Sequence, residues 1–280
     1  MAVIDAHHHF LDPERVDYPW LTDELAVLRR TYGPGELRPL LAQHGVDATV
    51  LVQTISSVDE TAEFLVTAEA AGFVAGVVGW VDLTAPDVGD TIAALRAGRG
   101  GGRLVGVRHQ VHDEADPGWL LRADVLRGLT AVRDAGLAYD LLVRPRELPA
   151  AVEVVHALDD LRFVVDHAAK PRIASGETEG WLEPMAQLAA AANVTCKLSG
   201  LVTEAGEGWT PDDLAPYADA VLAGFGPSRV MFGSDWPVCL LAADYATVVT
   251  TAEALVAGLT PDERAAVFGG TAAATYGLAS

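Results

Sequence analysis

The chain has 280 residues, of which 50% are hydrophobic, and a formal net charge of −20. This composition supports a sizeable core and excludes a disordered chain. The negative charge repels nucleic acid and anionic membranes, so we expect neither as a partner. Two cysteines form no disulfide framework, and no stretch reads as a signal or a membrane span. We expect a cytoplasmic protein that acts on a small-molecule substrate, and whether it forms a homo-oligomer is left open.

Eight apolar runs alternate with helix-like segments along the chain. The runs are continuously apolar, as in residues 49–52, which is typical of parallel strands buried on both faces. Helix signals separate them, such as the capping-box spacing of residues 57–60 and 260–263. The predicted strands are residues 3–7, 48–53, 73–80, 104–109, 138–143, 162–167, 194–199 and 230–235. This order predicts an α/β fold, a (β/α)8 TIM barrel in which residues 1–280 form a single domain. A doubly wound sheet is the alternative, but it usually has a glycine-rich turn after its first strand.

The first predicted strand ends in Asp5-Ala6-His7-His8-His9-Phe10. Because side chains alternate across a strand, we expect Asp5, His7 and His9 on one face and His8 on the other. Two imidazoles at this spacing can converge on one metal ion or one substrate. The apolar residues before them argue against a purification tag.

Polar residues also end several later predicted strands. Arg108 and His109 end the fourth strand, and they point to opposite faces if that strand is regular. His167 ends the sixth strand and is followed by Lys170, and Asp235 ends the eighth. Charged groups on apolar strands are costly to bury unless they face a site.

Strand alternation refines this set. It predicts that Val165 and His167 share one face, as do Gly233 and Asp235. Lys197 lies in the middle of the seventh predicted strand, where a lysine inside a barrel is rarely only structural. A side chain that reaches outward between helices is the alternative for Lys197.

Four of these residues, His7, His9, His167 and Asp235, could bind a single divalent ion such as Zn²⁺ or Mn²⁺. The same set also works without a metal, with ionised Asp235 accepting a proton from water and cationic groups stabilising an oxyanion. The long segment 11–34 carries Tyr18 and Trp20, which either stack on a ring-shaped ligand or anchor the loop.

These motifs together resemble the amidohydrolase superfamily. The resemblance is to the amidohydrolase-related branch that contains sugar lactonases, such as L-fuconolactonase and L-rhamnonolactonase, and 2-pyrone-4,6-dicarboxylate lactonase. The motifs span nearly the whole chain in the family's order: Asp5-Ala6-His7-His8-His9-Phe10, Tyr18-Pro19-Trp20-Leu21, Gly106-Val107-Arg108-His109-Gln110, Asp166-His167, Lys170-Pro171, Cys196-Lys197-Leu198-Ser199-Gly200-Leu201 and Phe232-Gly233-Ser234-Asp235-Trp236-Pro237-Val238. The chain departs from the pattern at Leu11 and Ala169, where relatives often have tryptophan and glycine.

The resemblance implies a hydrolase that opens a lactone, with a sugar aldonolactone as the expected substrate. It implies Asp235 as the general base and His7, His9 and His167 as metal ligands or substrate contacts. It leaves open whether a metal is needed, and no lysine of the fourth or fifth strand is placed to bridge two metals. The alternatives are a metal-dependent decarboxylase and a hydrolase of an aromatic or natural-product substrate on the same scaffold.

The expected roles within the site divide into two groups. Expected catalytic residues are Asp235, His167 and Lys197, with Lys197 or Arg108 stabilising the oxyanion if no metal does. Expected substrate contacts are Arg108, His109, Trp20, Tyr18 and Lys170.

Overall fold

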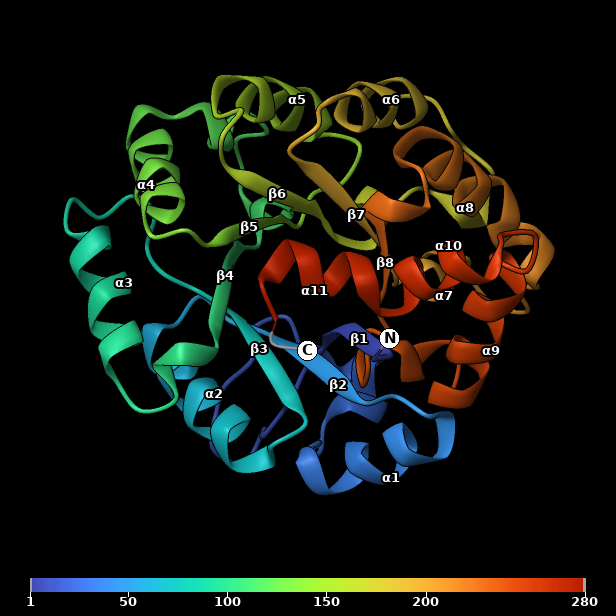
Figure 1. Cartoon of the computed structure of the whole chain (residues 1–280), viewed down its shortest axis with the longest axis horizontal. Coiled ribbons are helices and arrows are strands. Elements are labelled where there is room, and N and C mark those ends of the chain that lie inside the picture. Colours follow the sequence, from blue (N-terminus) through green and yellow to red (C-terminus); the bar gives the residue numbers. More distant parts are fainter. Residues whose placement is uncertain (1, 279–280) are drawn as a thin grey trace.

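The computed structural model describes residues 2–278 and contains eight parallel strands in sequential order around a barrel (Figure 1). A bridge between His8 and Trp236 joins the first strand to the segment after the last. The strands are β1 (Ile4–His8), β2 (Ala48–Val52), β3 (Val74–Gly79), β4 (Leu104–His109), β5 (Ala138–Leu141), β6 (Arg162–Val165), β7 (Val194–Leu198) and β8 (Val230–Phe232). The predicted TIM barrel is confirmed, and every predicted strand is present with ends that differ by at most three residues.

Helices surround the barrel and cover the outer faces of the strands (Figure 1). The cap predicted at residues 57–60 is formed, since the Ser57 side chain accepts a hydrogen bond from the Glu60 backbone. The helices are α1 (Pro34–His44), α2 (Val58–Ala71), α3 (Val88–Ala97), α4 (Ala123–Asp134), α5 (Leu148–Ala157), α6 (Leu182–Ala190), α7 (Leu201–Glu204), α8 (Pro211–Phe225), α9 (Tyr245–Leu255), α10 (Pro261–Ala265) and α11 (Thr271–Tyr276). No helix within residues 2–278 is long and apolar enough to cross a bilayer.

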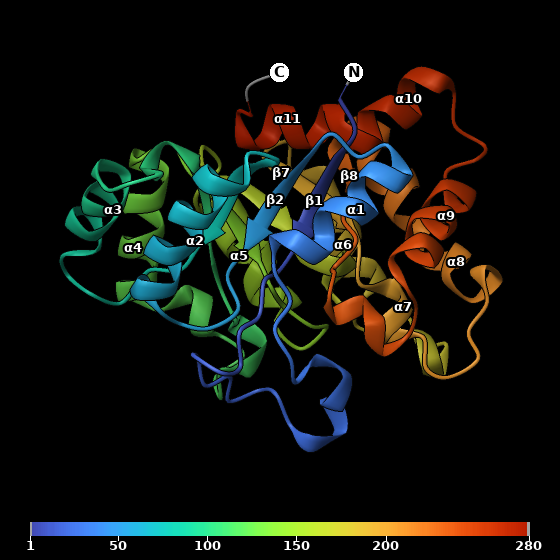
Figure 2. The same ribbon diagram turned by 90° about the horizontal axis from the view of Figure 1, so that it is seen from below.

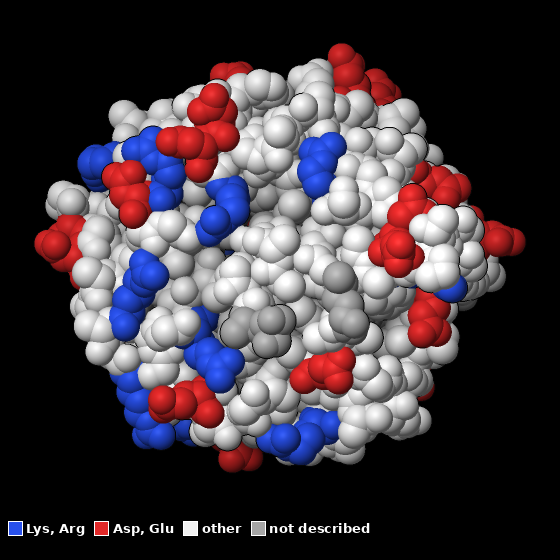
Figure 3. Space-filling model, in the orientation of Figure 1, with Lys and Arg blue, Asp and Glu red and all other residues white. Residues whose placement is uncertain are grey.

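The two ends of the barrel differ. Helix α11 lies across the end at which the strands begin, and the described part of the chain begins and ends beside it (Figures 1 and 2). Its Ala272 and Tyr276 pack against a buried cluster inside the barrel that includes Ile4 and Val50. The surface over α11 is mostly uncharged, with charges of both signs around it (Figure 3). The segment between β1 and α1 projects from the opposite end (Figure 2).

The first strand contains an irregularity that the sequence did not predict. The pairing register of β1 with β2 shifts between Asp5 and His8. Ala6 belongs to the inner cluster, while His8 bonds Thr49 and Asp5 bonds Tyr245 of the outer helix α9. The prediction that Asp5 shares a face with His7 and His9 is therefore wrong, because a bulge interrupts the alternation.

Candidate functional site

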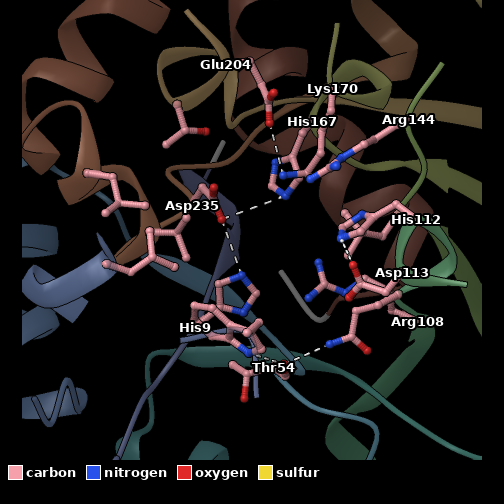
Figure 4. A pocket seen from close by; sticks show the side chains of 17 residues that line it. His9, Thr54, Arg108, His112, Asp113, Arg144, His167, Lys170, Glu204 and Asp235 are labelled. Carbon is pink, nitrogen blue, oxygen red and sulfur yellow. Dashed lines mark hydrogen bonds and ion pairs between the residues drawn. The ribbon is translucent and has the colours of Figure 1, made fainter. Parts of the chain in front are cut away.

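A cavity of about 360 Å³ opens at the carboxyl ends of the strands (Figure 4). Polar and apolar side chains both line this cavity. The lining residues are His9, Trp20, Leu25, Thr54, Arg108, Gln110, His112, Asp113, Leu142, Arg144, His167, Lys170, Thr203, Glu204, Asp235, Val238 and Leu241. Such a concave, partly apolar pocket with convergent polar groups is typical of a small-molecule site.

Three imidazoles converge on one oxygen of Asp235 at the cavity floor. The Asp235 Oδ1 atom lies 3.4 Å from His9 Nε2, 3.7 Å from His7 Nε2 and 3.9 Å from His167 Nε2. Figure 4 shows the Asp235 carboxylate between His9 and His167. Asp235 has φ of 58°, and its backbone amide donates to the carbonyl of His7. The chain therefore holds this carboxylate in an uncommon backbone conformation, a feature that occurs often at active sites.

His9 and His167 are each oriented by a second contact. His9 Nδ1 lies 2.8 Å from the carbonyl oxygen of Val52 and donates to it, so His9 Nε2 presents a lone pair to the cavity. His167 Nδ1 lies 2.8 Å from the hydroxyl of Ser199. A side chain at Gly200 would meet the His167 ring at 2.5 Å, so only glycine fits beside it.

His167 reaches the site through a turn rather than through strand alternation. Val165 packs in the outer core, which places the next residue, Asp166, toward the barrel interior. His167, Ala168, Ala169 and Lys170 all have positive φ, between 49° and 59°. The prediction that His167 and Val165 share one face does not hold, because this left-handed turn redirects His167 into the cavity.

The electrostatics favour an ionised Asp235 carboxylate at the cavity floor. Burial raises the pKa of Asp235, but His167, His9 and His7 together hold it below its ordinary value. Burial lowers the pKa of His167 to about 4, and burial and then Lys197 lower the pKa of His7. At neutral pH the site therefore holds a carboxylate that can accept a proton.

A buried ion-pair network lies directly beneath the cavity. Arg108 donates to Asp166 Oδ2 at 2.9 Å and to the side chain and carbonyl of Gln53. Lys197 Nζ lies 2.6 Å from Asp140 Oδ2 and 2.9 Å from Asp166 Oδ1. Lys197 and both of its carboxylate partners are fully buried. Buried charges in such a network are mutually compensated, and each depends on its partners.

The structure brings most of the predicted site residues together. His9, Trp20, Arg108, His167, Lys170 and Asp235 line the cavity. His7 lies behind His9, with 3.1 Å between their Nε2 atoms. Trp20 donates to the carbonyl of Thr54, so it is an anchored wall of the pocket.

Three predictions need correction. Tyr18 is buried against Trp20, its hydroxyl accepts from the Asp12 amide, and it does not line the cavity. His109 points out of the barrel, where it stacks on Trp119 and lies outside the cavity lining. Regular alternation along β4 explains this, since Arg108 takes the inward position.

Lys197 is the third case. It faces the barrel interior, as predicted, but it is fully buried below the cavity floor and is absent from the lining. It therefore cannot contact an oxyanion in the cavity as expected.

Several residues of the site were not predicted from the sequence. Asp140 and Asp166 are the acidic partners of the network, and both could have been found as carboxylates at inward positions of β5 and its neighbour. His112, Arg144 and Glu204 line the cavity from loops, for which strand alternation gives no signal.

The donor set fits a divalent metal ion. His7, His9 and Asp235 offer ligand atoms within 4.8 Å of one another, and so do His7, Asp166 and His167. Imidazole and carboxylate ligands with an open position toward a cavity suit zinc and related ions.

Comparison with known proteins agrees with the motifs. The L-fucono-1,5-lactonase of Burkholderia ambifaria is 43% identical over 279 residues, covering 98% of this chain and 94% of that protein. The L-fucono-1,5-lactonase of Burkholderia multivorans is 41% identical over 287 aligned positions, covering 98% and 96%. A crystal structure of an amidohydrolase from Burkholderia multivorans with bound zinc is 41% identical, covers 100% of both chains and has a TM-score of 0.94. The profile of the amidohydrolase family matches residues 4–278. The chain belongs to the amidohydrolase family.

Proposed function

We propose that this protein hydrolyses a sugar aldonolactone of the L-fucono-1,5-lactone type. The observation that carries the proposal is the ionised Asp235 among three imidazoles at the floor of a cavity. The two L-fucono-1,5-lactonases that match nearly the full chain at 43% and 41% identity support this substrate class. The partner is a small molecule, and a cytoplasmic location and a homo-oligomeric state are parts of the proposal to be measured.

In the proposed reaction, Asp235 accepts a proton from the attacking water. The water oxygen bonds to the lactone carbonyl carbon, and the negative charge moves to the carbonyl oxygen. Arg108 lines the cavity, and the N–H of its Nη1 atom that is not bonded to Asp166 donates one hydrogen bond to this oxyanion, a contribution of roughly 2.7–4 kcal/mol in other enzymes. The bond from the carbonyl carbon to the ring oxygen then breaks, and Asp235 returns its proton to the leaving oxygen. The product is a hydroxy acid, which releases one proton at neutral pH.

A divalent ion, zinc or manganese, fits His7, His9 and Asp235, and the zinc in the Burkholderia multivorans relative supports zinc. When bound, such an ion polarises the carbonyl and lowers the pKa of water.

The test is acid release, followed with a pH indicator, on a panel of aldono-1,4- and aldono-1,5-lactones. We expect fast release with one sugar configuration. Well-folded protein that releases no acid from any of these lactones would contradict the proposal. Carbon dioxide release from aromatic carboxylic acids would instead identify the decarboxylase that the sequence left as an alternative.

A further inference from the structure

The chain has only two lysines, Lys170 and Lys197, and their surroundings differ. Lys170 lines the cavity and pairs with Glu204 at 3.3 Å. Lys197 is fully buried below the cavity, and three groups lie within 3.1 Å of its ammonium nitrogen. Two are the carboxylates of Asp140 and Asp166, and the third is His7 Nδ1 at 3.1 Å.

The hydrogen-bond partners of His7 indicate which ring nitrogen carries its proton. An ammonium group has donors only, so His7 Nδ1 accepts from Lys197, and the one proton of the neutral ring is on Nε2. His9 donates through Nδ1 to Val52, so its Nε2 can accept. The 3.1 Å contact between the two Nε2 atoms is then a hydrogen bond from His7 to His9.

The opposite assignment fits the distances less well. It places the proton on His7 Nδ1, which would donate to Asp166 Oδ1 at 3.5 Å, while Nε2 would accept from Arg108 at 3.4 Å. It also leaves hydrogens facing each other at the 3.1 Å Lys197 contact and lone pairs facing each other at the 3.1 Å contact with His9. The two shortest contacts of His7 therefore favour the proton on Nε2.

The position of Lys197 is fixed from below. Asp140 Oδ2 accepts both from Lys197 and from the hydroxyl of Tyr276, at 2.7 Å, on helix α11. The Lys197 ammonium also lies 5.6 Å from the centre of the Tyr276 ring. Asp166 is held in turn by Arg108. Two cations and two carboxylates balance in this network, so the ammonium group is anchored beside His7.

A metal ion at His7 needs the opposite arrangement. A histidine binds a metal through a nitrogen that carries no proton, and its other nitrogen usually donates to a carboxylate. If His7 binds the metal through Nε2, the carboxylate that accepts from its Nδ1 is that of Asp166, and Lys197 competes with Asp166 for this nitrogen. We propose that Lys197 is a positioning residue that holds the Nε2-protonated form of His7 and thereby weakens divalent-metal binding at His7, His9 and Asp235.

The experiment measures the His7 tautomer and the zinc affinity separately. In metal-free protein, ¹⁵N chemical shifts of the imidazoles, assigned with His7→Gln, report which nitrogen carries the proton. Zinc affinity is measured by competition with a chromophoric chelator. The variants are Lys197→Met and Lys170→Met; the second removes an equal charge from the cavity wall without touching His7.

We expect the Nε2-protonated form in the unaltered protein and in Lys170→Met. In Lys197→Met we expect the proton on Nδ1 and zinc binding at least ~10-fold tighter than in Lys170→Met, because the nearby positive charge and the competing donor are both lost. A proton on His7 Nδ1 in the unaltered protein would overturn the proposal, and this result does not depend on whether Lys197→Met folds. Equal or weaker zinc binding by folded Lys197→Met would also overturn it. Neither readout depends on the lactone.

Discussion

The inner surface of the barrel changes from apolar to charged between one inward position of a strand and the next, two residues later. Toward the end covered by α11, the inward positions are apolar or small, as at Ala138 and Val164. Two residues further along the chain, the next inward positions carry Asp140 and Asp166. One step of strand alternation therefore separates a layer that packs from a layer that carries charge. The apolar layer packs the beginnings of the strands against α11. The charged layer holds the side chains that reach the cavity.

The largest expected effect is on catalysis at Asp235. Asp235→Asn removes the proton acceptor, and asparagine also tolerates the positive φ, so the fold is retained. We expect kcat to fall by about 10³-fold. Lactone turnover and circular dichroism measure the two effects. Asp219→Asn on the surface of α8 is the control, and retention of most activity by Asp235→Asn would rule out this residue as the base.

Breaking the charged layer is expected to cost stability. Asp166→Ala leaves Arg108 and Lys197 without a shared carboxylate, and we expect a loss of about 3–5 kcal/mol in the free energy of unfolding. Urea unfolding measures it, with the exposed Asp159→Ala as the control. A loss as small as that of the control would show that the network does not need this carboxylate.

The apolar layer offers a matching test. Met231 is fully buried in the inner cluster, and Met231→Ala should cost about 2–5 kcal/mol of unfolding free energy by leaving a cavity. Met231→Leu preserves volume and should cost less than about 1.5 kcal/mol. Similar losses in both variants would indicate that side-chain volume does not determine the stability of this layer.

The pH dependence of stability tests a cavity wall that carries several cations. Burial, followed by Lys170, Arg144 and Arg108, lowers the pKa of His112 to about 3 from 6.5 in an unfolded chain. Between pH 6.5 and 3 the unfolded chain binds a proton that the folded protein does not, so stability falls as pH falls through this window. His112→Asn should reduce this slope by up to about 1.4 kcal/mol per pH unit. Urea unfolding from pH 7 to pH 4 measures the slope, and an unchanged slope would contradict the shift.

The smallest expected effect is at the link between the layers. Tyr276→Phe removes the hydrogen bond to Asp140 and should cost about 1 kcal/mol of unfolding free energy. Tyr139→Phe removes a buried hydroxyl that has no partner within residues 2–278 and should cost less. Thermal unfolding of both variants, followed by calorimetry, makes the comparison. Equal losses would mean that the Tyr276 bond adds nothing.

Much of the site was predictable because strand ends are legible in the chain. Apolar runs mark the strands, and polar residues at their carboxyl ends identified His9, His167 and Asp235. Alternation correctly separated His9 from His8, which bonds Thr49 on the outer side of β1. The predictions are wrong at the positions where a bulge or a turn interrupts this alternation.

The barrel, the order of its strands and the residue types that meet at one end all follow from the pattern of apolar runs and polar strand ends along the chain. Three side-chain positions instead depend on tertiary contacts: Asp5 points outward, His167 enters through a left-handed turn and Lys197 lies beneath the cavity. The physical reason is that side-chain alternation is a local property of one strand. A bulge, a turn with positive φ and the depth of a side chain depend on the neighbouring strands and on α11, which are distant in the sequence.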